Sequence, residues 1–198
     1  MKNEIPTPQI HRLQSFSLGD VTNYVFGFSD DETVAALVLG NLNYTNAPLV
    51  RVHSRCLYGE VFASEDCDCK SQKELAFKLL KEEGTGVFVY LEQEGRGCGL
   101  LNKAKAYVMK EKGGLDTVEA YQRLGLIIDK RLYSRAAIAL KHLGIGSVRL
   151  LTNNPQKVMG LQAEGIIVER VPLITVPTPH NIEYLRVKQN KLGQDLGL

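Results

Sequence analysis

Apolar and polar residues alternate through the N-terminal part of the chain without the spacing of a helix. Short runs rich in β-branched and aromatic residues occur at 14–18, 21–28, 33–39 and 48–53. Glycine, aspartate and asparagine separate these runs, and such a pattern is typical of strands joined by tight turns. The N-terminal part of the sequence therefore predicts an antiparallel sheet.

The pattern changes after residue 70, where helical and strand-like stretches alternate. Apolar spacing and stop signals predict helices at 71–83, 100–112, 133–143 and 155–164, and a polar helix in the tail up to about residue 195. Strands are predicted at 87–91, 147–152 and 166–173. Strand–helix–strand order favours a parallel or mixed sheet with right-handed crossovers. We therefore expect an α/β (α+β mixed) fold, with antiparallel N-terminal strands leading into a mixed sheet, in one domain over residues 1–198.

Composition and charge narrow the class of protein. Hydrophobic residues make up 44% and charged residues 23% of the chain, an ordinary balance for a soluble globular protein. The sequence has no apolar run near the ~20 residues of a membrane span, and a net charge of +2 gives no electrostatic case for nucleic acid. The opening residues are polar and interrupted by Pro6, unlike a secretory signal. We expect a cytoplasmic protein with no membrane or nucleic-acid partner.

Three of the four cysteines fall in one short stretch, as Cys56, Cys67 and Cys69 in the pattern C-x10-C-x-C. Thiolates bind zinc well, and three protein ligands plus one water form the arrangement of a catalytic zinc site. On a strand, the two cysteines of the C-x-C pair would point to the same face. A closed structural site would need a fourth ligand, for which His53 and Cys98 are the candidates.

Neither inert thiols nor disulfides fit this cysteine pattern as well as a metal does. Buried inert thiols are common in proteins, but Glu65, Asp66 and Asp68 surround the C-x-C pair with charge. A disulfide framework needs an oxidising compartment and is typical of small, cysteine-dense chains. Four cysteines in 198 residues are not dense. The sequence therefore favours a zinc site with an open position.

Polar loops follow two of the predicted strands. A glycine-rich loop with Glu94 and Arg96 follows the strand at 87–91, where open α/β sheets bind ligands, although an ordinary βα turn has the same spacing. Asn154 is suited to cap the helix that begins at Pro155, but Lys157 is unfavourable in a first turn unless an anion binds there.

Asp129 and Arg131 would face the same way only in an extended segment. Taken alone, such a pair is typical of a solvated surface.

Together these motifs resemble those of GTP cyclohydrolase II. The resemblance covers about residues 48–173 and rests on R-V-H-S at 51–54, the C-x10-C-x-C, Q-E-G-R at 93–96, G-L-L-N-K at 99–103, D-T-V-E-A at 116–120 and L-L-T-N-N-P at 150–155. It implies zinc-dependent hydrolysis of GTP with release of formate and pyrophosphate. The implied product is 2,5-diamino-6-(5-phosphoribosylamino)pyrimidin-4(3H)-one, and the implied step is the first committed one of riboflavin biosynthesis. It also implies a homodimer and Mg2+ on the substrate phosphates.

The resemblance assigns residues to these roles. Cys56, Cys67 and Cys69 are implied as Zn2+ ligands, Asp129 as proton acceptor, Arg131 as the nucleophile and Tyr107 as a residue near the base. Because a guanidinium stays protonated, Arg131 could instead stabilise charge on the α-phosphate. The implied GTP-binding residues are Arg51, Val52, His53, Ser54, Arg55, Gln72, Glu94, Gly95, Arg96, Thr117, Thr152 and Lys157.

The sequence departs from the family pattern at two charged positions. Arg55 stands where the family usually has glutamate, and Asp66 where it usually has a basic residue. We hypothesise that the two side chains meet beside the metal and have exchanged signs. Arg55→Glu and Asp66→Arg should then each impair GTP turnover, and the double variant should recover it. A double variant no better than the worse single variant would contradict the exchange.

Two other functions stay open at this point. A diverged paralogue could act on GTP or another purine nucleotide and make a different product. A non-catalytic nucleotide-binding or nucleic-acid-binding zinc protein belongs to another class; the low net charge and the missing fourth ligand argue against nucleic acid.

Overall fold

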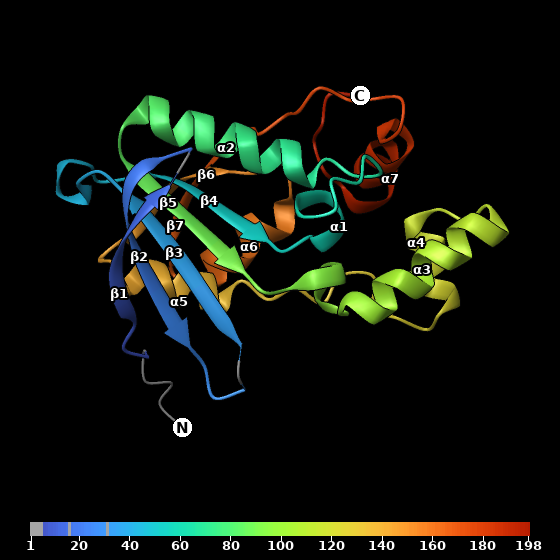
Figure 1. The fold of residues 1–198 in the computed structure, drawn as a ribbon, viewed down its shortest axis with the longest axis horizontal. Helices are drawn as coiled ribbons and strands as arrows, with labels where there is room; N and C mark the ends of the chain where they lie inside the picture. Colours follow the sequence, from blue (N-terminus) through green and yellow to red (C-terminus); the bar gives the residue numbers. More distant parts are fainter. Residues whose placement is uncertain (1–5, 16, 31) are drawn as a thin grey trace. The chain divides into compact units, whose positions relative to one another are not determined.

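Seven strands form one mixed sheet in the computed structural model, which describes residues 6–15, 17–30 and 32–198 (Figure 1). The order across the sheet is β1-β2-β3-β5-β4-β6-β7. The strands are β1 (Gln9–Ser15), β2 (Gly19–Gly27), β3 (Thr33–Leu39), β4 (Leu49–Ser54), β5 (Gly86–Leu91), β6 (Ser147–Leu151) and β7 (Ile167–Val171).

The sheet is antiparallel in its N-terminal half and parallel in the other. The antiparallel pairs are β1 with β2, β2 with β3, and β3 with β5. The parallel pairs are β4 with β6 and β6 with β7. The neighbouring strands β4 and β5 run in the same direction (Figure 1). The predicted mixed sheet with βα crossovers is confirmed.

Helices cover both faces of the sheet. Val50 belongs to a core that includes Leu140 of α5 (Ser134–His142) and Leu161 of α6 (Pro155–Ala163). Its neighbour Leu49 belongs to a second core, with Leu80 of α2 (Cys69–Glu83). Successive strand residues point to opposite faces, so β4 needs apolar side chains at both. This explains why the predicted central strands are almost continuously apolar.

The chain divides into two compact units, and each is built from three separate segments. The first comprises residues up to 53, 73–92 and 133–173, and contains the sheet with its two cores. The second comprises 54–72, 93–132 and 174–198. Its elements are α1 (Leu57–Glu60), the first turn of α2, the 3-10 turn η2 (Glu94–Gly97), α3 (Leu100–Gly113), α4 (Thr117–Arg123) and α7 (Ile182–Leu192). Its small apolar core lies between α3 and α4, around Ala106, Ala120 and Tyr121.

Local structure differs at three places from what the sequence suggests. The strand expected at 14–18 lies earlier, as β1, because Ser17 and Leu18 turn into β2; residue 16 lies outside the described residues. The C-x-C pair is not on a strand, since Cys67 lies in a bend and Cys69 begins α2. The short helices α1 and α4 were not predicted. Of the helices described, none has both the length and the apolar character needed to cross a membrane.

Candidate metal and nucleotide site

The three predicted metal ligands converge in the second unit. The sulfur atoms of Cys56, Cys67 and Cys69 all lie within 4.8 Å of one another, and those of Cys56 and Cys67 are 3.8 Å apart. A tetrahedral zinc with Zn–S bonds of about 2.3 Å holds its sulfurs roughly 3.8 Å apart. All four cysteines of the chain are free thiols. The three side chains therefore fit a zinc ion.

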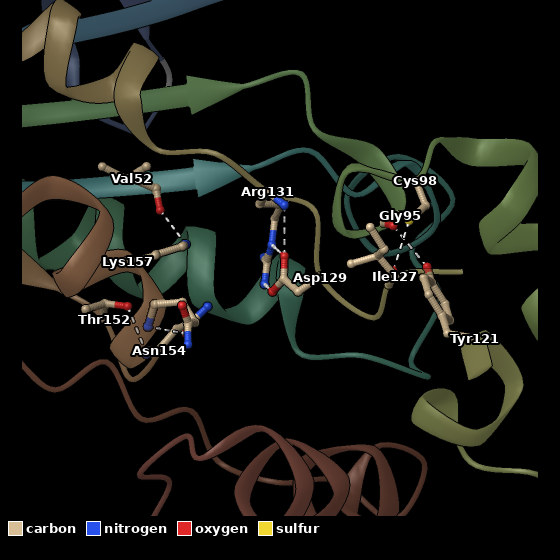
Figure 2. A network of polar contacts seen from close by, with 11 residues as sticks. Val52, Gly95, Cys98, Tyr121, Ile127, Asp129, Arg131, Thr152, Asn154 and Lys157 are labelled. Atoms are coloured by element: carbon tan, nitrogen blue, oxygen red, sulfur yellow. Dashed lines mark hydrogen bonds and ion pairs between the residues drawn. The ribbon is translucent and has the colours of Figure 1, made fainter. Parts of the chain in front are cut away.

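In the described part of the chain, this ligand group contains three residues and no fourth. Cys98 lies elsewhere, where its thiol donates to the carbonyl of Ile127 at 3.3 Å (Figure 2). His53 belongs to the first unit. A three-cysteine set leaves a coordination position for water or substrate, as catalytic zinc sites do.

Close packing around the sulfurs requires a glycine at position 59. Cys56 is the N-cap of α1, and its sulfur accepts from the Gly59 amide at 3.5 Å. A Cβ atom at Gly59 would lie 2.8 Å from the sulfur of Cys67. Any larger residue would thus push Cys67 away from its partners.

The metal-free thiols share their protons unequally. Hydrogen bonds from the Cys67 and Cys69 thiols hold the pKa of Cys56 far below its ordinary value, although burial opposes this. The bond to Cys56 raises the pKa of Cys67 to about 11, and bonds to Cys56 and Cys67 raise the pKa of Cys69 as well. Binding of a metal to all three sulfurs would therefore release protons.

A buried lysine places a positive charge beside the group of three cysteines. Lys103, on α3, donates to the sulfur of Cys56 at 3.2 Å and to a carboxylate oxygen of Glu94 at 2.8 Å. The other Glu94 oxygen accepts from the Leu57 amide at 2.6 Å, and the Lys103 ammonium lies 4.5 Å from the ring centre of Tyr58. Burial lowers the pKa of Lys103, but Glu94 and Cys56 outweigh it and raise the pKa above its usual value. The lysine is therefore a fixed positive charge beside the thiolate.

Glu94, for which the family resemblance implies a role in GTP binding, already accepts hydrogen bonds from the protein. Besides Lys103 and Leu57, it accepts from the Gly95 amide at 3.0 Å. A carboxylate offers about four lone-pair sites. About one site is left for a ligand.

Arg96 holds an unusual conformation with two unpartnered donors. Its φ of 55° and ψ of 36° are left-handed, which is uncommon for a residue other than glycine. The guanidinium carbon lies 5.9 Å from the ring centre of Tyr121, and both terminal nitrogens are buried without a hydrogen-bond partner among the described residues. The Ser54 hydroxyl is in the same state. Strained backbone with unmatched donors indicates a ligand site.

Tyr121 of α4 holds the loop that carries Arg96. The Tyr121 hydroxyl donates to the carbonyl of Gly95 at 3.0 Å (Figure 2). Burial raises the pKa of Tyr121 to about 12, so this donor keeps its proton at neutral pH.

Asp129 and Arg131 form a two-point ion pair (Figure 2). Arg131 donates through Nε at 2.9 Å and Nη2 at 2.5 Å, one bond to each carboxylate oxygen. Their side chains are 25% and 14% exposed, so the pair is half-buried and not a solvated surface pair. Burial raises the pKa of Asp129, but the bonds from Arg131 outweigh it and lower the pKa. Both groups therefore stay charged at neutral pH.

Tyr107 and Thr117 lie on α3 and α4, the two helices on either side of the small apolar core of the second unit. Tyr107, on α3, meets the ring of Tyr58 edge-on with centroids 5.2 Å apart. Burial raises the pKa of Tyr107 above its usual value. Thr117 is the first residue of α4, whose N-cap is Asp116.

The remaining expected residues of the second unit lie beside the cysteines. Gln72 donates to a carboxylate oxygen of Asp68 at 2.6 Å. Arg55 is exposed next to Cys56, and Asp66 is exposed and accepts from the Ser64 hydroxyl at 2.7 Å. The proposed sign exchange between Arg55 and Asp66 stays a prediction.

In the first unit, the expected residues gather at the carboxyl end of β4. Arg51 is buried and donates to the carbonyl of Leu151, the last residue of β6, at 2.8 Å. A second guanidinium nitrogen of Arg51 lies 3.4 Å from Nδ1 of His53. The His53 ring stacks against Phe88 and Tyr90 of β5, with centroids 5.6 and 6.0 Å apart.

The turn after β6 completes this group. Asn154 caps α6 as predicted, by accepting from the Gln156 amide at 2.9 Å. The Thr152 hydroxyl accepts from the Asn154 amide at 3.1 Å, and the Lys157 ammonium donates to the carbonyl of Val52 at 2.7 Å (Figure 2). Parallel strands β4 and β6 end at one edge of the sheet, where ligands bind in open α/β folds.

The sequence did not single out three residues that support the metal ligands. Lys103 was visible only as the last letter of the G-L-L-N-K motif. Asp68 was counted only among acidic neighbours, and Lys188 lies in the polar tail. Lys103 is 9% exposed and lies beside the Cys56 sulfur, and only the folded structure shows this contact.

Comparison with known proteins gives a consistent result. The family model of GTP cyclohydrolase II matches residues 9–172. A GTP cyclohydrolase-2 of Pseudomonas putida (strain GB-1) is 49% identical over 175 residues, which is 86% of this chain and 85% of that protein. Riboflavin biosynthesis protein RibBA of Bacillus velezensis is 48% identical over 174 residues. That match covers 85% of this chain but 44% of the relative, so the chain spans less than half of RibBA.

Proposed function

The chain belongs to the GTP cyclohydrolase II family, and on that premise we propose that it hydrolyses GTP, opening the guanine imidazole ring. Formate and pyrophosphate leave, and the product is 2,5-diamino-6-(5-phosphoribosylamino)pyrimidin-4(3H)-one. This is the first committed step of riboflavin biosynthesis, the pathway named for the RibBA relative.

The observation that carries the proposal is the convergence of three free thiols on one point. We assign Cys56, Cys67 and Cys69 as ligands of one Zn2+. When bound, zinc supplies a Lewis acid that makes water nucleophilic near neutral pH. Thiols must stay reduced to bind metal, which supports a cytoplasmic location.

The unmatched donors of the second unit support binding of the nucleotide. The Arg96 guanidinium can fork onto a phosphate, and the Ser54 hydroxyl can bond a polar ligand atom. Glu94 keeps one acceptor site for an amino–imino edge such as that of guanine. We also assign Arg55, Gln72, Gly95 and Thr117 of this unit to the GTP site, and Arg51, Val52, His53, Thr152 and Lys157 of the first unit. Mg2+ would neutralise the phosphates.

Asp129 and Arg131 are assigned to the hydrolytic steps, with Tyr107 near the base. Asp129 is ionised at neutral pH, because Arg131 lowers its pKa, and can accept a proton. A guanidinium bonded to a carboxylate has no electron pair to offer as a nucleophile. We therefore assign Arg131 to stabilising negative charge on the α-phosphate as pyrophosphate leaves.

We further propose one functional domain that forms a homodimer. The three-segment construction of each unit supports a single domain, because neither unit is a continuous piece of chain. The dimer is supported by the family resemblance. Light scattering should give twice the mass of one chain; a monomeric mass in active protein would contradict it.

The proposal is tested with purified zinc-loaded protein, GTP and Mg2+, by assaying formate and pyrophosphate separately. We expect both products, and neither from a Cys67→Ser variant or from metal-stripped protein. Restoring zinc should restore activity to the stripped wild type but not to the variant. GTP that binds but yields neither product would contradict the proposal and favour the diverged paralogue.

A further inference from the structure

The C-terminal helix α7 buries a charged side chain, although most of its surface is polar. Lys188 is 7% exposed, and Leu185 on the same helix is 2% exposed. Lysine is almost never buried without a partner. The match to the family model ends at residue 172, before this helix begins. The role of α7 must therefore be found in its contacts.

The partner of Lys188 lies between two of the metal ligands. Its ammonium forms an ion pair with Asp68, which is 1% exposed and stands between Cys67 and Cys69. The ammonium also lies 4.6 Å from the ring centre of Tyr184. A buried ion pair fixes geometry closely, because neither charge can move without losing its partner.

Asp68 passes this restraint on to the residues that follow. Its second carboxylate oxygen accepts from the Gln72 side chain at 2.6 Å, and its carbonyl accepts from the Gln72 amide at 2.9 Å. We call residues 67–72 the metal segment. It holds two of the zinc ligands and Gln72, which we assign to GTP binding. The Asp68 carboxylate thus links α7 both to the two cysteines and to Gln72.

A second lysine ties the same helix to another part of the site. Lys191 forms ion pairs with Asp116 and with Glu119, the latter at 2.9 Å. These two acids form the capping box that begins α4 at Thr117. Residues three apart on a helix lie on one side, so Lys188 and Lys191 project together. The Lys191 pairs are partly exposed and weaker, so the inference rests on Lys188.

We propose that α7 is a positioning element for the metal segment: Lys188 holds Asp68 and thereby sets Cys67, Cys69 and Gln72 for metal and substrate. The inference rests on the proposed function, since it assumes that the cysteines bind zinc. Lys188 is a positioning residue, whose ammonium pairs with the Asp68 carboxylate. It acts through Asp68.

The test measures how fast zinc leaves the protein when an excess of a coloured chelator is added. In Lys188→Met the Asp68 carboxylate loses its buried cation, so the metal segment should loosen, and zinc should be released at least tenfold faster. Arg186→Met is the matched control, because Arg186 is an exposed cation on the same helix and pairs with Glu183 at the surface. Its release rate should stay within twofold of the wild type. Lys188→Arg, which keeps a cation, should recover most of the loss.

A double variant separates positioning from general damage. Asp68→Asn alone should also speed zinc release, and Lys188→Met with Asp68→Asn should be no faster than the worse single variant. The double variant does not bury an Asp68 carboxylate without its cation. Its zinc release can therefore be measured even if Lys188→Met fails to fold. Fully additive effects would overturn the inference, because the two residues would then act independently.

Kinetics with GTP add a readout that simple destabilisation does not move. If α7 sets Gln72, the KM for GTP should rise in zinc-saturated Lys188→Met, while Arg186→Met keeps the wild-type value. Wild-type protein that takes up no zinc would overturn the proposed function together with this inference. Zinc-loaded, active wild type with unchanged release in Lys188→Met overturns the inference alone.

Discussion

Arg131 is the residue whose proposed role follows most directly from its contacts. Its guanidinium is bonded at two points to Asp129 and so remains a cation. Arg131→Met should reduce pyrophosphate release about 10²–10³-fold, the usual loss for one electrostatic donor, while formate release stays within about tenfold. The two products should be assayed in the same reactions, with Lys130→Met, an exposed neighbour, as control. A covalent intermediate trapped on Arg131 would contradict this role.

Lys103 gives a prediction about stability, because its ammonium is the buried cation that contacts both Cys56 and Glu94. Lys103→Met leaves the Glu94 carboxylate and the Cys56 thiolate buried without their cation. Removing one partner of a buried pair costs about 3–5 kcal/mol, so the free energy of unfolding should fall by that order. Urea unfolding of the metal-free protein measures it, with Lys105→Met on the exposed side of α3 as control. A loss equal to that of the control would show that the pair is dispensable.

At the scale of elements, the start of α4 gives a stability prediction with a pH dependence. The Asp116 carboxylate accepts from the amides of Val118 at 2.7 Å and Glu119 at 3.0 Å. Asp116→Ala should lower the free energy of unfolding by about 1 kcal/mol at pH 7, whereas Asp116→Asn, which can still cap, should lose less. Denaturant unfolding of the three proteins measures the difference.

The sign of the pH effect follows from the pKa of Asp116. Burial raises this pKa, but the bond from Lys191 and the amide bonds outweigh it and lower the pKa in the folded state. The carboxylate therefore stabilises the fold above the ordinary aspartate pKa of about 3.9, and this contribution is lost as the pH falls through the folded pKa. The gap between wild type and Asp116→Asn should shrink in acid. A gap that is constant with pH would contradict the assigned charge.

The elements that sequence predicted well are those with local signals. α2, α3, α5 and α6 carry apolar spacing over several turns, and α6 also carries an Asn–Pro start. α4 has seven residues, too few for a clear period, although the D-x-x-E of its capping box was readable in the sequence. α1 has four residues and is held by Cys56 as its cap. Such short helices depend on tertiary contacts.

The same distinction separates the parts of the site. Spacing within the chain was sufficient to predict that Cys56, Cys67 and Cys69 form one metal site, and the structure brings their sulfurs together. The supporting contacts join residues far apart: Lys103 and Cys56 are 47 positions apart, and Lys188 and Asp68 are 120 apart. No periodicity reaches over such distances. A buried lysine in a polar tail has the same sequence signature as a solvated one.

At the scale of the whole molecule, the two units should respond differently to loss of metal. The first has two apolar cores on either side of the sheet, whereas the apolar core of the second is the small cluster between α3 and α4. A metal held by Cys56, Cys67 and Cys69 would brace the segment 54–72, which Lys103 and Lys188 join to the other two segments of the second unit. Chelation should therefore speed amide exchange in 54–72, 93–132 and 174–198 more than in the strands of the sheet.

Hydrogen-exchange mass spectrometry before and after chelation makes this comparison. Cys56→Ser should show the same pattern without chelator, and Cys98→Ser should not, because Cys98 donates to Ile127 outside the ligand cluster. An equal rise in exchange across both units would contradict a local role of the metal. It would mean that the chain opens as one cooperative body, since each unit is assembled from three segments and neither can then unfold without the other.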